Sequence, residues 1–274
     1  MRTALSGLNL HRAASVNDAL VLLRDERRTP IAGATDLYVA LNFGTLAPRA
    51  FVDLWPLHEL RQISMRQDTL VIGALATYSD AIQSALVARH LPMLVEAARL
   101  VGGPQIQNRG TIGGNVANAS PAGDSLPVFA AADATVVLRT TAAERRVAFR
   151  DFYSGYRATV MEPDELIVSI EVPPLAGKQW FRKVGTRAAQ AISKVVVAGV
   201  RGDVSRLAFG SVGPTVVRAW HAERLLSSGG SIDDAVDALK ADIAPIDDIR
   251  STADYRQRVA TNLLRRFWSE TATV

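Results

Sequence analysis

The chain has 274 residues, 48% hydrophobic and 21% charged, with 19 glycines, 12 prolines and no cysteine. This length suffices for one large domain or two smaller ones, and the composition excludes a disordered, collagen-like or coiled-coil protein. No apolar run approaches the roughly 20 residues of a membrane helix. Without cysteine, the chain has no disulfide, thiolate nucleophile or thiolate-bound cluster of its own. The first ten residues lack a signal-peptide pattern, which favours the cytoplasm.

The charge pattern argues against nucleic-acid binding. Lysine and arginine number 31 against 27 acidic residues, a net charge of +4, and aromatic residues make up only 6%. A nucleic-acid-binding protein usually concentrates its basic residues and places aromatic residues between them. Here the arginines are dispersed, apart from a cluster near the C-terminus. That cluster could be a partner-docking face, although a solvated helix face is the simpler interpretation.

Short β patterns alternate with helical patterns, which predicts a mixed α and β protein. In the first half, Ser15 can cap a helix that runs to Leu23, with Asp18 at the capping-box position. Strands are expected at residues 30–32, 50–54 and 70–73, and helices at residues 77–86 and 92–100.

In the second half, strands are expected at residues 134–138 and 166–172, and residues 173–177 are the best linker candidate. Three successive antiparallel strands (180–184, 195–200, 207–212) and three helices (219–226, 231–240, 252–269) should follow. The last helix is amphipathic. Its pattern predicts that Tyr255, Val259, Leu263 and Phe267 are buried and that Arg256, Arg258, Arg265 and Arg266 lie largely elsewhere.

Standard catalytic signatures are missing: the sequence has no Walker A loop, G-x-G-x-x-G, G-x-S-x-G or H-E-x-x-H motif. The four histidines are scattered without metal-ligand spacing. An acidic run, Glu162, Asp164 and Glu165 around Pro163, is more typical of a solvated turn before a strand. We therefore assign no catalytic residue and no metal ligand.

Two glycine-containing loops remain. The first covers residues 32–37, directly after a strand, and the second covers residues 109–115 and continues to residue 125. Small residues let the backbone approach a ligand closely and turn its amides toward an anion. Neutral donors are added by the hydroxyls of Thr35, Thr111 and Ser120 and by the side-chain amides of Asn115 and Asn118. Such a surface suits a pyrophosphate, without lysine or Mg²⁺.

The two loops differ in how strongly they indicate a ligand. The first by itself is more simply a tight turn. The second has glycines at positions 110, 113 and 114 with polar residues between them, followed by Ser-Pro-x-x-Asp-Ser-x-Pro. This composite is longer than a turn requires, and it favours ligand binding.

Residues 109–127 resemble the FAD-binding medium subunit of the molybdenum hydroxylases, the group of xanthine dehydrogenase, carbon monoxide dehydrogenase and 4-hydroxybenzoyl-CoA reductase. The first loop resembles their A-G-G-T-D-L phosphate loop, with Ala34 where many members have a second glycine. Residues 164–173 resemble the family's E-L-I-x-x-I-x-x-P strand, and residues 181–193 its aromatic-x-K-x-x-x-R segment. Four motifs therefore occur in order between residues 32 and 193.

This resemblance implies an α+β fold. A two-part FAD-binding domain of the p-cresol methylhydroxylase/vanillyl-alcohol oxidase type is expected over residues 1–174, with subdomains at about 1–55 and 56–174. A smaller α+β C-terminal domain should cover residues 175–274.

The resemblance also implies the FAD-binding residues: Ala32, Gly33, Ala34, Thr35, Asp36, Leu37, Thr111, Ile112, Gly113, Gly114, Asn115, Asn118, Asp124, Ile167 and Lys183. The two loops would supply amides and side chains to the pyrophosphate. Asp124 would face the ribose or adenine end, and Ile167 would offer backbone contact. Lys183 would approach the flavin's polar edge, unless it is a strand lysine paired with a surface acid. No aromatic residue that stacks on the isoalloxazine is identified.

In function, the resemblance implies an oxidoreductase subunit that carries FAD. In that family, substrate is oxidised at a molybdopterin centre on a large subunit, and electrons cross 2Fe–2S clusters on a small subunit to FAD and an external acceptor. Because this chain has no cysteine, those other centres are expected on partner chains. The expected assembly is a dimer of heterotrimers. A stand-alone flavin-dependent oxidoreductase of the same superfold and a non-redox structural subunit are the alternatives.

Overall fold

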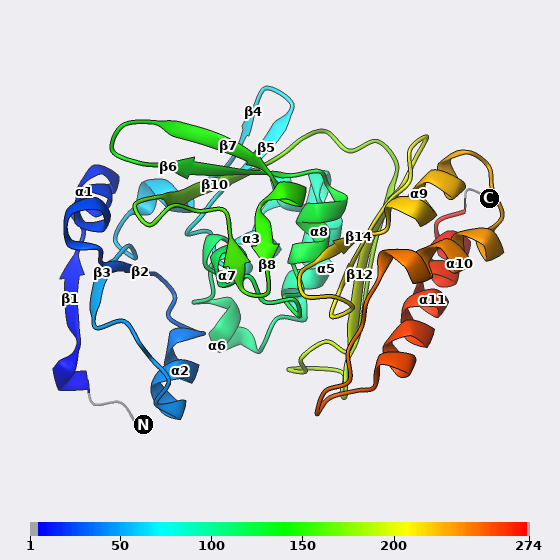
Figure 1. The fold of residues 1–274 in the computed structure, drawn as a ribbon. Helices are drawn as coiled ribbons and strands as arrows, with labels where there is room; N and C mark the ends of the chain where they lie inside the picture. Colours follow the sequence, from blue (N-terminus) through cyan, green and yellow to red (C-terminus); the bar gives the residue numbers. More distant parts are fainter. Residues whose placement is uncertain (1–4, 273–274) are drawn as a thin grey trace.

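The computed structural model describes residues 5–272, which form three larger sheets in chain order, each with its own helices, and a two-stranded hairpin (Figure 1). The N-terminal sheet is parallel, with strand order β1-β3-β2. Its elements are η1 (Leu5–Gly7), β1 (Asn9–Arg12), α1 (Val16–Glu26), β2 (Thr29–Ile31), α2 (Leu37–Phe43) and β3 (Ala50–Asp53). Ser15 caps α1 as predicted, by accepting from the Asp18 amide. The buried face of α1, including Leu20 and Leu23, belongs to one core with Val52 of β3.

The middle sheet is antiparallel and five-stranded, in the order β4-β5-β10-β6-β7. Its strands are β4 (Ile63–Arg66), β5 (Thr69–Gly73), β6 (Thr135–Arg139), β7 (Glu144–Ala148) and β10 (Leu166–Val172). The helices of this part are η2 (His58–Arg61), α3 (Tyr78–Gln83), α4 (Ala85–His90), α5 (Pro92–Arg99), α6 (Pro104–Gln107), α7 (Ile112–Asn118), α8 (Leu126–Ala131) and η3 (Phe149–Asp151). A small hairpin joins β8 (Tyr153–Gly155) to β9 (Ala158–Thr159).

The C-terminal sheet is an antiparallel meander of β11 (Lys178–Val184), β12 (Val195–Arg201), β13 (Arg206–Gly210) and β14 (Val217–Arg218). The helices α9 (Trp220–Ser227), α10 (Ile232–Asp242) and α11 (Ala253–Glu270) follow it. In β12, Val195 and Val197 pack among the C-terminal helices, whereas Val196 and Ala198 join the core of the middle part. Since successive strand residues point to opposite faces, this sheet separates the two cores, as the yellow strands do in Figure 1.

The α+β class is confirmed, and the expected elements occur in the expected order, with one helix divided. The structure adds elements that were not expected, among them β1, β4, β7, α2, α7 and α8. The helix expected at residues 77–86 is two short helices, α3 and α4, that meet at Ser84. The Ser84 backbone is extended (φ −74°, ψ 117°), and its hydroxyl accepts from the Val87 amide. A serine that caps a new helix ends the preceding one, because the cap position requires non-helical dihedral angles. None of the helices described in residues 5–272 combines the length and the hydropathy needed to cross a bilayer.

The expected buried face of the last helix is confirmed at Leu263 and Phe267 and is wrong at the start of the helix. In α11, Tyr255 is 42% exposed, whereas Arg256 is only 5% exposed. The Arg256 guanidinium donates to the Ser211 carbonyl (2.8 Å) and to Asp248 Oδ1 (2.7 Å). These partners satisfy a charge that would otherwise be costly to bury, so hydropathy alone misplaces the face.

The acidic run is also not wholly a solvated turn. Glu165 is 5% exposed, and Arg145 of β7 donates to both of its carboxylate oxygens, at 2.5 and 2.7 Å. These hydrogen bonds from Arg145 hold the pKa of Glu165 below its usual value. The expectation is therefore wrong for Glu165. Its ion pair with Arg145 links the residue before β10 to strand β7.

Candidate functional site

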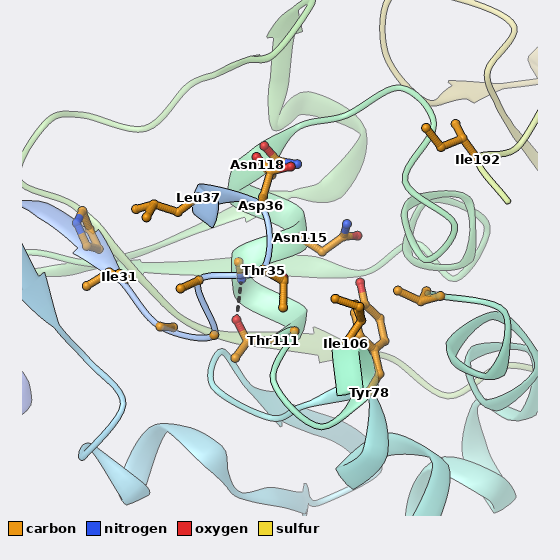
Figure 2. A pocket seen from close by; sticks show the side chains of 17 residues that line it. Ile31, Thr35, Asp36, Leu37, Tyr78, Ile106, Thr111, Asn115, Asn118 and Ile192 are labelled. Carbon is orange, nitrogen blue, oxygen red and sulfur yellow. Dashed lines mark hydrogen bonds between the residues drawn. The ribbon is translucent and has the colours of Figure 1, made fainter. Parts of the chain in front are cut away.

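The two glycine loops meet in space. Gly33 lies so close to residues 109–110 that a Cβ on it would stand 1.8 Å from the Arg109 carbonyl oxygen. Only glycine fits at such an approach. The seam between the loops forms one wall of a cavity of about 440 Å³, shown in Figure 2.

Most of the predicted site residues line this cavity: Ala32, Gly33, Ala34, Thr35, Asp36 and Leu37 from the first loop, and Thr111, Gly114, Asn115 and Asn118 from the second. The sequence analysis missed the other lining residues: Pro30, Ile31, Tyr78, Val101, Ile106, Gly110 and Ile192. They come from separate elements and carry no shared motif. Gly110 and Ile192 lie inside the quoted motifs, which is the signal that could have found them.

The first loop presents unpartnered backbone amides. Ala34 has a left-handed conformation (φ 60°), and Asp36 has a right-handed one. Among the described residues, the amides of Gly33, Ala34, Thr35 and Asp36 donate no hydrogen bond. Successive unpaired amides in a turn such as this one can form a concave anion-binding nest. The first loop, the weaker candidate by sequence, therefore has the stronger anion-binding geometry.

The second loop uses its amides to build its own structure. The amides of Ile112 and Gly113 donate to the Ala76 and Ala74 carbonyls (2.8 Å each). The Gly114 amide donates to the Thr111 hydroxyl (3.1 Å), which caps α7, and the Asn115 amide donates to the Thr111 carbonyl (3.0 Å). These amides are thus already occupied.

The glycines of the second loop serve packing and access instead. A Cβ on Gly113 would stand 2.7 Å from the Ala74 Cβ. The glycine therefore lets α7 pack closely against Ala74, the residue that follows β5. A Cβ on Gly114 would meet only the Thr111 side chain within 4 Å, and Gly114 lines the cavity. The second loop therefore contributes two things to the cavity: a wall without a side chain at Gly114, and the side chain of Asn115.

Asp124 and Lys183 form a buried ion pair, with Nζ and Oδ2 2.6 Å apart and side chains 10% and 6% exposed. Lys183 also donates to the Leu100 carbonyl (3.1 Å). Burial raises the pKa of Asp124 to about 6, although Lys183 acts in the opposite direction. The alternative in which Lys183 pairs with a surface acid is therefore wrong.

Asp124 lines a second cavity of about 400 Å³. This cavity shares Asp36, Val101, Asn115, Asn118 and Ile192 with the first, so the two are continuous. A third cavity of about 820 Å³ shares the first loop and extends to Trp55, over whose ring the Arg109 guanidinium lies at 3.7 Å. The three cavities adjoin one another in an elongated row, and the first loop lies near the middle of that row.

Ile112 and Ile167 are not brought to this surface. Both belong to the core of the middle part, at 0% and 4% exposed, and neither lines these cavities. Gly113 and Lys183 likewise lie behind the cavity wall. Within the described residues, no group of three or more histidine or acidic side chains is placed to hold a metal ion.

Comparison with known proteins decides the family. Residues 6–175 match the family described as the FAD binding domain in molybdopterin dehydrogenase, and residues 179–271 match the CO dehydrogenase flavoprotein C-terminal domain. The chain belongs to the FAD-binding medium-subunit family of the molybdenum hydroxylases. It is accordingly an oxidoreductase subunit of the molybdopterin-dependent dehydrogenase type, with FAD as its cofactor.

Relatives match over nearly the whole chain. The glyceraldehyde dehydrogenase medium chain of Sulfolobus acidocaldarius is 33% identical over 95% of this chain and 97% of its own. The carbon monoxide dehydrogenase medium chain of Hydrogenophaga pseudoflava is 33% identical over 93% and 94%. Among solved structures, carbon monoxide dehydrogenase from Hydrogenophaga pseudoflava superposes with a TM-score of 0.90 at 31% identity, over 97% of this chain and 98% of that one. Quinoline 2-oxidoreductase from Pseudomonas putida gives 0.91 at 26% identity, over 99% and 98%.

The site residues fit FAD. At Gly33 the two loops approach so closely that there is no room for a Cβ. The unpaired amides of the first loop suit the pyrophosphate at the middle of an elongated dinucleotide. Two buried polar atoms beside the cavities, Asp124 Oδ1 and Tyr78 Oη, have no hydrogen-bond partner within the described residues. Buried polar groups are normally paired, so a polar ligand in these cavities accounts for both.

The expected roles of Asp124 and Lys183 cannot both hold. One was expected at the ribose or adenine end and the other at the flavin, yet the two side chains are 2.6 Å apart. The two ends of an extended dinucleotide lie much farther apart than this 2.6 Å separation. At most one of these two roles can therefore apply, and Asp124 is the member of the pair that lines the cavity.

Proposed function

We propose that this chain is the FAD-carrying electron-transfer subunit of a cytoplasmic, three-chain molybdenum hydroxylase or dehydrogenase. It takes electrons from 2Fe–2S clusters on a small chain and delivers them to an external acceptor. The observation that carries the proposal is the joined pair of loops, where four residues whose amides donate no hydrogen bond within the described residues line a cavity beside Gly114. Bound FAD supplies chemistry that the side chains lack, because flavin exchanges electrons singly or in pairs.

The chain's own residues bind and orient the cofactor. The amides of residues 33–36 would hold the pyrophosphate, with the side chains of Asn115 and Asn118 beside it. Arg157 donates to Asn118 Oδ1 (2.8 Å), which leaves the Asn118 NH₂ group as a donor. The family resemblance puts a lysine at the polar edge of the flavin, so Asp124, held by Lys183, would face the flavin half. The cavity that Asp124 lines with Val101 and Ile192 would then take that half, and the cavity with Trp55 the other.

The domain division that we propose follows the cores. Residues 1–174 would be the FAD-binding domain, with subdomains at about 1–55 and 56–174, and residues 175–274 the C-terminal domain. The segment between β10 and β11 contains no helix or strand. The C-terminal sheet still shares Val196 and Ala198 with the middle core, so the two domains would move together.

Partner chains complete the proposal. Several relatives are named medium chains, and this sequence has no cysteine with which to hold an iron–sulfur cluster. We place the 2Fe–2S clusters on a small chain and the molybdopterin cofactor on a large chain, in a dimer of heterotrimers. The mass of the native protein tests this assembly, and a mass equal to that of a single chain would contradict it.

The first experiment is an absorption spectrum of the purified chain, followed by identification of the released cofactor. Flavin bands with FAD as the released species are expected. A colourless protein that cannot be reconstituted with FAD would overturn the proposal in favour of a structural subunit. Substrate-driven flavin reduction should then require the small and large chains, whereas turnover by this chain alone would indicate a stand-alone flavoenzyme.

A further inference from the structure

Tyr78 has a buried hydroxyl that no neighbour satisfies. It is the first residue of α3, its side chain is 2% exposed, and its Oη has no hydrogen-bond partner within the described residues. The Ser125 hydroxyl donates to Asn115 Oδ1 (2.8 Å), and its oxygen lies near enough to Tyr78 to act against the rise in the pKa of the phenol. Of the buried side-chain polar atoms without a partner, Tyr78 Oη and Asp124 Oδ1 belong to the cavity at the two loops and to its Asp124 neighbour.

The backbone holds this ring in place. Thr77 caps α3 in a reciprocal capping box with Asp80, and the Tyr78 amide donates to the Gly110 carbonyl (3.2 Å). A Cβ on Gly110 would stand 3.3 Å from the Tyr78 ring, so the glycine lets the ring pack beneath the second loop. Figure 2 shows the hydroxyl pointing toward Asn115, on the wall of the cavity.

Tyr153 provides the contrast. Its hydroxyl donates to the Val116 carbonyl (3.1 Å), on the same helix α7 that forms the cavity floor. Leaving a buried hydroxyl unpaired costs about 1–3 kcal/mol. Tyr153 avoids that cost with a partner in the chain, whereas the Tyr78 hydroxyl makes no hydrogen bond to any of residues 5–272.

We propose that Tyr78 is an FAD-binding residue whose hydroxyl hydrogen-bonds to the flavin half of the cofactor, its ribityl chain or isoalloxazine ring. This inference rests on the proposed FAD site. Tyr78 shares its cavity wall with Val101 and Ile192, which also line the cavity of Asp124. The opposite cavity, with Trp55 and Arg109, does not include Tyr78. Burial raises the pKa of Tyr78, so its hydroxyl stays protonated and can donate.

The test compares Tyr78→Phe with Tyr153→Phe in the full chain, with FAD and ADP as titrants in calorimetry. Tyr78→Phe should raise the Kd for FAD about five- to tenfold, the loss of one neutral hydrogen bond, and leave the Kd for ADP unchanged. Without cofactor, its melting temperature should stay the same or rise, because an unpaired buried hydroxyl is removed. Tyr153→Phe should do the reverse, lowering the melting temperature and leaving FAD affinity unchanged.

Two results would overturn the proposal while the FAD site stands. In the first, Tyr78→Phe binds FAD as tightly as the wild type. In the second, it loses affinity for FAD and ADP equally, which would place the hydroxyl at the ADP half. If the wild-type chain itself binds no FAD, the proposed function fails together with this inference.

Discussion

The first and second loops both contain glycine, but glycine does different work in each. In residues 32–37 the backbone leaves consecutive amides free, and its one tight approach is Gly33 against Arg109. In the second loop the amides of residues 112–115 already have partners, which are carbonyls that follow β5 or atoms of Thr111. Gly113 serves the packing of α7 against Ala74. A glycine-rich motif therefore does not by itself reveal where an anion binds. The hydrogen-bond inventory of its amides does.

The largest effect on stability is expected at Asp124, a buried acidic residue in the segment that follows the second loop. The folded-state pKa of about 6 lies above the unfolded value of 3.8, so the folded chain keeps a proton that the unfolded chain has lost. Stability from this group is therefore full below the unfolded pKa and falls as pH rises toward the folded one, by up to about 3 kcal/mol.

Asp124→Asn should remove this decrease. Urea unfolding of the FAD-free chain and the variant, from about pH 4 to about pH 7, measures the difference between their profiles. Parallel profiles would show that Asp124 ionises as freely in the folded chain as in the unfolded one.

The largest effect on binding is expected at the seam between the loops. Gly33→Ala would place a Cβ 1.8 Å from the Arg109 carbonyl oxygen and force the loops apart. A clash of this kind costs about 2–3 kcal/mol, so the Kd for FAD should rise roughly 30- to 150-fold. Calorimetry measures the affinity, and far-ultraviolet circular dichroism confirms the fold. Wild-type affinity in this variant would separate the first loop from the binding site.

Two threonines, one from each loop, give opposite expected outcomes. Thr111→Ala removes the cap of α7 and should lower the unfolding free energy by about 1 kcal/mol, with little change in FAD affinity. Thr35 lines the cavity, and no hydrogen bond of its side chain is recorded within the described residues. Thr35→Ala should therefore leave stability within about 0.5 kcal/mol and weaken FAD binding severalfold. Identical behaviour of the two variants would contradict the division of labour.

The smallest effect is expected at Ala34. Its φ of 60° is left-handed, a conformation that costs a non-glycine residue about 1 kcal/mol. Ala34→Gly should stabilise the chain by up to about 1 kcal/mol, less the extra entropy that glycine loses on folding. Thermal unfolding measures this gain, and unchanged FAD affinity makes the variant the matched control for Gly33→Ala. A clear loss of stability would show that the strain at Ala34 is relieved elsewhere.

Much of the site could be predicted because its motifs are local. The run from Ala32 to Leu37 was recognisable from adjacent residues, and all of it lines the cavity. Ile167 was carried over from a motif whose strand forms here, but it lies in the core. Tyr78 was recognised by neither route, because a tyrosine behind a capping threonine has no signature of its own. Its place in the wall depends on Gly110, from a different helix–loop segment.

The sequence by itself determined the elements, several caps such as Ser15 and Thr77, and the family, since these depend on periodicity and on neighbours within a few positions. Only the tertiary structure decided which polar groups were paired. Lys183 meets Asp124 across 59 positions, and Arg256 is buried against a carbonyl 45 positions away. The Tyr78 hydroxyl is left without a partner in the part of the chain that the structure describes. Such pairings depend on how distant segments pack, and the free energy of burying a polar group depends on the partner it finds there.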